Sequence, residues 1–274
     1  MKIDLHTHSY ISDGRLSPTD LVTRAAQSGV EMLALTDHDG IDGLNEARQS
    51  AIELGIQFIN GIELSVSWNK RTVHIIGLNF AMDYTPLQKG IQQLQDFRAV
   101  RAKEIADKLE ASGIKGAYEG AQYFAGGKML GRMHFAQFLV AQGHAKNIRS
   151  VFKKFLVSNK PGHVTGNWAS LEDAVQWITG AGGIAVIAHP ARYNLTRTKL
   201  RKLMTDFQVA GGQAIEVVSG CPCVNEINTM ACHADDFDFY ASLGSDFHDP
   251  DFAWIKLGHL PALPTKCKPV WDLF

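Results

Sequence analysis

The sequence predicts an α/β fold in which strands alternate with helices, the pattern of a parallel sheet or barrel. Three features of the chain indicate this fold. Short apolar runs alternate with helical segments near both ends, side chains able to bind metals follow most of these runs, and a long helical stretch separates the two alternating regions. At 274 residues, the chain can form one barrel domain with a large core.

The first alternating region covers residues 1–83. A capping serine, Ser17, and a proline in the first turn, Pro18, mark the start of its first helix. We expect strands at residues 2–5, 32–35, 56–59 and 74–80, and helices at residues 17–29 and 41–54. The second region follows residue 163, with a helix at residues 171–179 and strands at 184–188, 214–218 and 239–243.

Residues 84–163 differ from both regions, and we expect them to form an inserted, mostly helical subdomain. Thr85 and Pro86 begin a long helix that ends near Gly113, with apolar residues at helical spacing. The segment has 13 Lys or Arg residues against 5 Asp or Glu residues, whereas the rest of the chain has 14 against 23. The predicted organisation is a discontinuous barrel, residues 1–83 and 164–274, interrupted by a basic insertion.

The composition argues against several classes of protein, including proteins that coat nucleic acid, zinc fingers and membrane-spanning proteins. The net charge of −1 argues against a protein that coats nucleic acid through bulk electrostatics. The four cysteines, Cys221, Cys223, Cys232 and Cys267, lack zinc-finger spacing, and so few thiols are typical of a reducing compartment. No apolar run approaches the roughly 20 residues of a membrane span. The first predicted strand begins at residue 2 and is followed by predicted ligands, so we expect no signal peptide. We therefore expect a cytoplasmic protein that does not bind membranes.

Nine side chains that can bind metals carry most of the chemical information. They are His6, His8, Asp13, His38, Glu63, His74, His189, Asp246 and His248. Most follow predicted strands, where the loops of an α/β barrel converge over the active site. His74 is the exception, because it begins its predicted strand or lies within it. Imidazole and carboxylate groups bind divalent cations, and nine exceed the need of one ion, so we expect a cluster of two or three metals.

The motifs around these residues resemble those of the polymerase and histidinol phosphatase (PHP) superfamily. They are Asp4-Leu5-His6-Thr7-His8-Ser9, Ser12-Asp13-Gly14, Thr36-Asp37-His38-Asp39, Gly61-Ile62-Glu63-Leu64-Ser65, Val73-His74, Ala188-His189-Pro190 and Gly244-Ser245-Asp246-Phe247-His248. The pattern is most similar to that of nucleoside 3′,5′-bisphosphate phosphatases and of the related 5′ to 3′ exoribonuclease RNase AM, whose domain also carries a helical insertion. The resemblance implies a distorted (β/α)7 barrel.

The resemblance also implies three metal positions. The first metal would be bound by His6, His8, Glu63 and Asp246. Glu63 would bridge to a second metal, bound also by His74 and His189, because a carboxylate has two oxygens. The third would be bound by Asp13, His38 and His248. Mn²⁺ is the favoured ion, and Fe²⁺ or Zn²⁺ would also suit these ligands. The sequence has no evident nucleophile elbow, so we expect metal-bound hydroxide to attack the phosphoester.

The sequence allows two alternative roles for Asp37 and Asp39, the residues on either side of His38. Asp37 and Asp39 could orient metal-bound imidazoles through the second ring nitrogen, or either could cap the following helix. Both interpretations fit the sequence.

Within the insertion, Gly131-Arg132-Met133-His134 resembles a Gly-Arg-Pro-His segment of the family, whose arginine and histidine bind substrate phosphate. We expect Arg132 and His134 to have that role, against the alternative of an ordinary helix surface, and Met133 replaces the usual proline. Arginine offers a planar, charged fork that suits phosphate oxygens. For Arg98 and Arg101, on the long helix, a solvated face is the favoured interpretation. Arg192 and Arg197 could lie near the metals or in solvent.

Together, these features predict a metal-dependent phosphoesterase. A basic insertion would favour a substrate with a second phosphate, such as a nucleotide or short RNA whose 5′ phosphate is held while the 3′ phosphoester is cut. A terminal 3′ phosphate would make the protein a bisphosphate phosphatase, and a further nucleotide would make it a 5′ to 3′ exoribonuclease. The alternatives are a small-metabolite phosphatase, such as a histidinol phosphatase, and a non-catalytic PHP module. No protein partner is implied.

Overall fold

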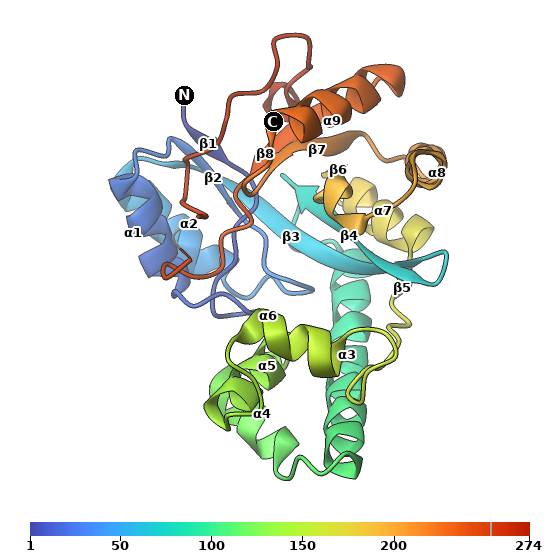
Figure 1. Ribbon diagram of the computed structural model, residues 1–274. Helices are drawn as coiled ribbons and strands as arrows, with labels where there is room; N and C mark the ends of the chain where they lie inside the picture. The colour runs from blue at the N-terminus through green and yellow to red at the C-terminus, as the bar shows by residue number, and fades with distance from the viewer. Residues whose placement is uncertain (253) are drawn as a thin grey trace. The chain divides into compact units, whose positions relative to one another are not determined.

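The computed structural model describes residues 1–252 and 254–274 (Figure 1). The chain forms two compact units: the barrel unit, residues 1–91 with 168–274, and the helical unit, residues 92–167. The expected domain boundaries at residues 84 and 163 remain a prediction. Among the described residues, none of the helices combines the length and apolar character needed to cross a membrane.

The barrel unit is built on one sheet. Its strands in the described residues are β1 (Ile3–Asp4), β2 (Met32–Leu35), β3 (Gln57–Trp68), β4 (Arg71–Leu78), β5 (Ala169–Ser170), β6 (Ile184–Ile187), β7 (Ala214–Ser219) and β8 (Tyr240–Gly244). The strand order is β1-β2-β3-β4-β6-β7-β8, and β5 pairs with β3 outside this path. Leu5 N donates to Leu243 O at 3.1 Å, and this bond connects the two ends of the sheet. The result is a nearly closed barrel, as predicted.

Strand β4 departs from the parallel pattern that we predicted, because it runs antiparallel to both β3 and β6. β3 continues to Trp68 rather than ending at residue 59, so Glu63 lies inside it. Asn69 and Lys70, with φ of 46° and 61°, then form a two-residue turn into β4. β4 therefore begins at the edge of the sheet where its neighbours β3 and β6 end. His74 lies near this start, which explains why it belongs with the strand-end residues although it is inside a strand.

Helices surround the strands of the barrel unit (Figure 1). They are α1 (Pro18–Gln27), α2 (Leu44–Leu54), α7 (Leu171–Gly180), α8 (Arg197–Val209) and α9 (Val224–Asp236), with short 3-10 turns η2 (Pro190–Tyr193) and η3 (Val270–Leu273). As predicted, Ser17 caps α1, since its side chain accepts from Asp20 N. Gly43 is the N-cap of α2, without a side-chain cap bond, so the interpretation of Asp37 or Asp39 as its cap is wrong.

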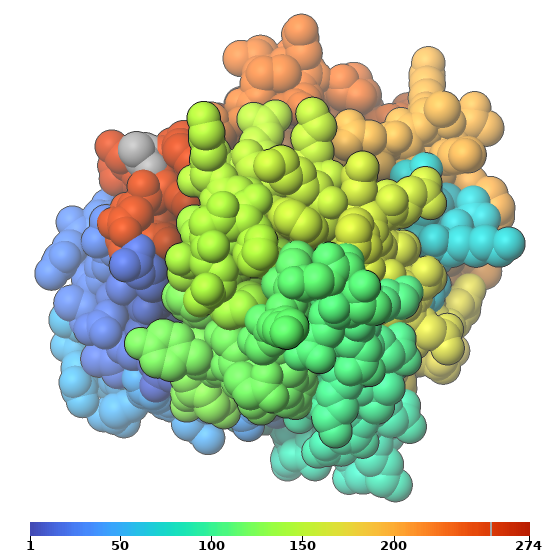
Figure 2. Space-filling model, turned by 60° about the horizontal axis from the view of Figure 1, so that its bottom comes forward, coloured from blue at the N-terminus to red at the C-terminus, as the bar shows by residue number. Residues whose placement is uncertain are grey.

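The helical unit has a core of its own. It contains most of α3 (Thr85–Ala111), together with α4 (Ala117–Ala125), α5 (Arg132–Ala141), α6 (Ile148–Val151) and the π-helical turn η1 (Phe152–Leu156). Leu109, Phe135, Leu139 and Val151 are fully buried among these elements. Figure 2 displays one face of this unit in green to yellow. The regularly spaced apolar residues that predicted the long helix therefore form the buried face of α3.

Candidate metal centre

The loops after four parallel strands supply most of the predicted ligands. His6 and His8 follow β1, His38 follows β2, His189 follows β6, and Asp246 and His248 follow β8. Two backbone bonds hold the first and last of these segments together: His8 N donates to Phe247 O at 2.9 Å, and Asp246 N donates to His6 O at 2.8 Å. The closure of the barrel therefore places ligands from both ends of the chain side by side.

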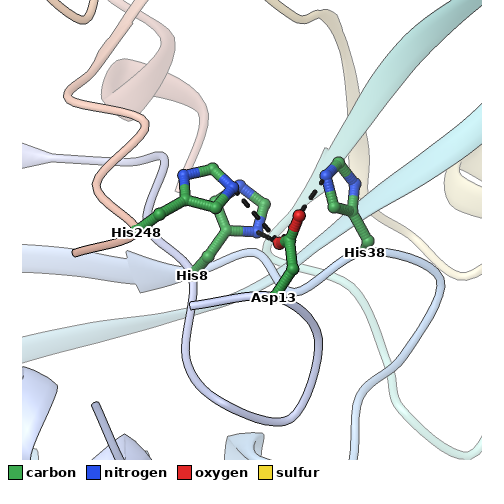
Figure 3. Close-up of side chains that lie close together, drawn as sticks. All are labelled: His8, Asp13, His38 and His248. Carbon is green, nitrogen blue, oxygen red and sulfur yellow. Dashed lines mark ion pairs between the residues drawn. The ribbon is translucent and has the colours of Figure 1, made fainter. Parts of the chain in front are cut away.

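All nine predicted side chains meet in this region. Their candidate ligand atoms form four overlapping groups, and within each group all atoms lie within 4.8 Å of one another. The groups are His8, Asp13, His38 and His248; His6, Glu63 and His189; His6, His8 and Asp246; and His38, Glu63 and His74. Figure 3 shows the first group, in which three rings surround the Asp13 carboxylate.

Glu63 lies at the centre of the cluster, and its two oxygens face different imidazoles. Oε1 lies 2.9 Å from His74 Nδ1 and 3.0 Å from His189 Nε2. Oε2 lies 2.9 Å from His38 Nδ1, 3.3 Å from His8 Nε2 and 3.4 Å from His6 Nε2. The side chain is 1% exposed. This geometry suits a carboxylate that bridges two cations.

Several buried polar atoms of the cluster have no hydrogen-bond partner in the described part of the chain. They include His8 Nδ1, Asp13 Oδ1, Glu63 Oε2 and His189 Nδ1. Imidazole nitrogens lie close to the two oxygens, 3.2 Å from Asp13 Oδ1 and 2.9 Å from Glu63 Oε2, but they are not aligned for a hydrogen bond. A buried polar atom without a partner costs about 1–3 kcal/mol, so native proteins rarely leave several in one place. Divalent cations would satisfy the oxygens and the ring nitrogens that converge on them. The residues present therefore fit a metal cluster.

Burial and neighbouring charges together shift the pKa values of several cluster residues in opposite directions. Burial raises the pKa of Glu63, but His38, His74 and His6 outweigh this effect and hold it well below the usual value. Burial lowers the pKa of His38 to about 4, despite the carboxylates of Glu63 and Asp13. At His248, Asp13 and Asp246 outweigh burial and raise the pKa to about 10. Near neutral pH, His38 is therefore neutral and Glu63 ionised, both ready to bind a cation, whereas His248 must first lose a proton.

Two of the nine residues have an unusual backbone conformation. His189 has a φ of 32° and Asp246 a φ of 55°, in the left-handed region that residues other than glycine seldom adopt. Such conformations cost about 1–3 kcal/mol and persist where the surrounding structure imposes them, often at functional sites. The fold therefore accepts a loss of stability that orients the His189 and Asp246 side chains toward the cluster.

Asp37 and Asp39, on either side of His38, hold loops of the site. Asp37 is buried and accepts from Ser9 N at 2.8 Å and from the Ser9 and Ser12 hydroxyls, both at 2.6 Å. These bonds fix the turn that carries Asp13. Asp39 Oδ1 accepts from Ser65 N at 2.6 Å, next to Glu63 on β3. Both aspartates thus support segments that carry predicted ligands.

Sequence reasoning overlooked two residues of the site. Glu216, in the middle of β7, is 1% exposed and contacts both His6 and His189. Tyr193 accepts a bond from His74 N at 2.8 Å through its hydroxyl. A lone glutamate inside the apolar run Ala-Ile-Glu-Val-Val was the available signal for Glu216, because buried carboxylates need partners. For Tyr193 the sequence offers no comparable signal.

Four of the predicted arginines lie in distinct environments. Arg192 donates from Nη1 to Asp246 Oδ2, which places it beside the cluster, while Arg197 is exposed at the start of α8. In the helical unit, Arg101 is 8% exposed and its guanidinium donates to Val164 O at 3.1 Å, so the interpretation of a solvated side chain is wrong for Arg101. Arg98 is partly buried.

The predicted phosphate-binding pair, Arg132 and His134, lies at the start of α5 in the helical unit. The Arg132 guanidinium carbon lies 5.8 Å from the centre of the Phe152 ring. Gly131 N donates to His134 Nδ1 at 3.0 Å. That bond makes Nε2 the donor nitrogen of the neutral ring.

A cluster of nine buried or partly buried imidazoles and carboxylates at one end of an α/β barrel fits a metal-dependent phosphoesterase. The chain belongs to the PHP domain family, which matches residues 4–178. It is accordingly a hydrolase that acts on phosphoester bonds. The resemblance inferred from the motifs is confirmed.

Several relatives match nearly the whole chain. The chain is 48% identical to the 3′,5′-nucleoside bisphosphate phosphatase of Chromobacterium violaceum, over 98% of this chain and 95% of that protein. It is 44% identical to a 5′-3′ exoribonuclease of Haemophilus influenzae, over 100% and 99% of the two chains.

Solved structures confirm the fold. An amidohydrolase from Chromobacterium violaceum, determined with bound sulfate and no metal, is similar with a TM-score of 0.94 at 47% identity, over 100% of this chain and 96% of that chain. A metal-dependent phosphoesterase structure from Bifidobacterium adolescentis is similar with a TM-score of 0.77 at 22% identity, over 99% and 93% of the chains, and at that identity supports the fold alone.

Proposed function

We propose that this protein hydrolyses the 3′ phosphoester of nucleotides that carry a 5′ phosphate, as a nucleoside 3′,5′-bisphosphate phosphatase, as a 5′ to 3′ exoribonuclease on short RNA, or as both. The observation that carries the proposal is the convergence of nine ligand-type side chains around Glu63. The names of the two relatives support the choice of substrate.

Two or three divalent cations would complete the site, with Mn²⁺ favoured over Fe²⁺ or Zn²⁺. We assign His6, His8, Glu63 and Asp246 to the first ion, Glu63, His74 and His189 to the second, and Asp13, His38 and His248 to the third. The ligand groups support the first and third sets, since His6, His8 and Asp246 form one group and the third set lies within another. The second set is supported by Glu63 Oε1, which lies 2.9 Å from His74 Nδ1 and 3.0 Å from His189 Nε2. When bound, such cations acidify water and neutralise the charge of the phosphate. Asp37 holds the turn of Asp13, and Asp39 holds β3 next to Glu63.

The 5′ phosphate would bind Arg132 and His134. Burial, together with the nearby guanidiniums of Arg132 and Arg98, lowers the pKa of Arg101 to about 9. Three guanidiniums close together repel one another, and a phosphate among them would turn repulsion into charge-assisted hydrogen bonding. His134 would add a donor through Nε2. This cationic cluster supports a substrate with a phosphate beyond the scissile one.

The test is product analysis with manganese-supplemented protein and a short RNA that carries a 5′ monophosphate. Stepwise release of nucleoside 5′-monophosphates, lost in Asp246→Asn, is the expected result for the exoribonuclease. Intact RNA, with a nucleoside 3′,5′-bisphosphate converted to the 5′-monophosphate, would restrict the protein to the phosphatase activity. If neither substrate reacts and histidinol phosphate does, the nucleotide proposal is wrong.

We also propose a cytoplasmic location. All four cysteines are free, and three of them are exposed, which suits a reducing compartment. Periplasmic recovery of the protein by cell fractionation would contradict this proposal.

A further inference from the structure

Glu216 is a buried carboxylate that the assignment of metal ligands leaves without a role. It lies on β7, where the register with β8 shifts between Glu216 and Val218, and its side chain is fully buried. A carboxylate placed in the interior is strongly unfavourable unless other groups compensate it. The contacts of Glu216 therefore indicate why the fold keeps it.

Each oxygen of Glu216 contacts a different predicted ligand residue. Oε1 lies 2.8 Å from His6 Nδ1, and Oε2 accepts from the backbone N–H of His189 at 2.5 Å. His6 follows β1 and His189 follows β6, so one side chain connects two loops that are distant in the sequence. The backbone bond also restrains His189 in its left-handed conformation, with a φ of 32°.

The contact with His6 determines which ring nitrogen can face a metal. A carboxylate can only accept, so His6 Nδ1 must carry a proton. In the neutral ring, the lone pair is then on Nε2. That atom lies 3.1 Å from His8 Nε2, 3.3 Å from Asp246 Oδ1 and 3.4 Å from Glu63 Oε2, the predicted ligands of the first metal.

The neighbouring strand leaves room for this pair. A Cβ atom at Gly244 would lie 2.2 Å from His6 Cβ, closer than packing allows, and 3.0 Å from Glu216 Oε1, which is a tight contact. Only glycine at this position lets the imidazole and the carboxylate approach each other. The pairing of His6 with Glu216 therefore depends on Glu216 in β7 and on Gly244 in β8, as well as on the loop that carries His6.

We propose that Glu216 is a positioning residue that holds His6 in its Nδ1–H tautomer and fixes the backbone of His189, so that both rings face the first and second metals. This inference rests on the proposed metal centre. Glu216 itself binds neither metal nor substrate. It acts through the two residues that it orients, as partners of metal-bound imidazoles commonly do, and loss of such a partner lowers metal affinity or activity roughly 10- to 100-fold.

The first test compares Mn²⁺ binding by wild type and Glu216→Gln, using calorimetry and metal analysis. We expect the variant to bind Mn²⁺ roughly 10- to 100-fold more weakly, to lose kcat with little change in KM, and to regain activity in excess Mn²⁺. The melting temperature of the metal-free protein reports any purely structural effect. Glu172→Gln, an exposed glutamate on α7, is the matched control and should behave as wild type.

Wild-type Mn²⁺ affinity and wild-type kcat in Glu216→Gln would overturn the inference while leaving the proposed function intact. If wild type itself binds no Mn²⁺ or Zn²⁺, the metal centre fails and the inference fails with it. If Glu216→Gln does not fold, the inference can be tested on zinc-loaded wild type. Imidazole ¹⁵N spectra then identify the tautomer of His6, whose signal is assigned by comparison with His6→Asn. An Nδ1–H tautomer at His6 supports the inference, and an Nε2–H tautomer overturns it.

Discussion

Asp13 Oδ1 lies 3.2 Å from His248 Nε2, although the two residues come from opposite ends of the chain (Figure 3). His38 Nε2 and His8 Nδ1 lie 3.9 Å and 4.0 Å from the same oxygen. Asp13 therefore supplies the negative charge at the centre of this group. The proposed third metal depends on that charge more than on any one imidazole.

The first prediction concerns this charge. Asp13→Asn keeps the shape of the side chain but removes the charge, so we expect the purified variant to contain fewer metal ions per chain, with the third ion lost first. Inductively coupled plasma mass spectrometry measures the content. Asp42→Asn, at an exposed aspartate, is the control. Equal metal content in Asp13→Asn and wild type would argue against the third metal.

The second prediction is that metal binding releases protons. The pKa of His248 is raised to about 10, because Asp13 and Asp246 outweigh burial, so the metal-free ring is protonated at pH 7. A cation must displace that proton, and its affinity should therefore rise with pH up to about 10. Calorimetry at pH 7 in two buffers with different ionisation enthalpies counts the protons. Identical heats in both buffers would contradict the prediction.

The third prediction follows from the same residue in the metal-free protein. A histidine whose folded pKa is raised contributes stability that is fully present below the unfolded value near 6.5 and is lost as pH rises through the folded value, here about 10. The melting temperature of the metal-free protein should therefore fall between these pH values. His248→Asn cannot titrate, and in that variant the decline should be shallower. Parallel curves for both proteins would be evidence against the linkage.

The fourth prediction concerns the 5′ phosphate. Arg132→Ala should raise KM for a 5′-phosphorylated nucleotide by roughly 10- to 100-fold and change kcat little, because the lost charge-assisted bonds hold a part of the substrate that does not react. A substrate with a 5′ hydroxyl should react equally with both proteins. Arg149→Ala removes the same charge from an exposed position on α6 and serves as control. An unchanged KM would remove Arg132 from the substrate site.

The fifth prediction concerns stability. Asp37→Ala removes the acceptor of three bonds from Ser9 and Ser12 and leaves buried donors without a partner. We expect a loss on the order of 3 kcal/mol in the free energy of unfolding, measured by urea denaturation of the metal-free protein. Asp42→Ala, at an exposed position, should change it by less than about 0.5 kcal/mol. A small effect of Asp37→Ala would mean that the turn holds without this carboxylate.

Many helices and strands of both units could be predicted from local sequence pattern. Ser17 and Pro18 correctly predicted the start of α1. The long helix expected from Thr85 to near Gly113 agrees with the bounds of α3, Thr85–Ala111. The antiparallel hairpin of β3 and β4 was not predicted, because Trp68-Asn69-Lys70-Arg71 lacks the glycine that usually marks a two-residue turn. Arg101 was also misjudged. Its burial depends on Val164, a contact between residues far apart in the sequence.

The sequence by itself determined which side chains could bind metals and which family the chain belongs to, because ligand chemistry and short motifs are local properties that can be read one segment at a time. Only the tertiary structure decided how these residues meet. It placed both oxygens of Glu63 between separate imidazoles, brought His74 to the site through an antiparallel strand, and set Glu216 behind His6. Those relations depend on strand direction, register and barrel closure, which arise from packing between segments far apart in the chain.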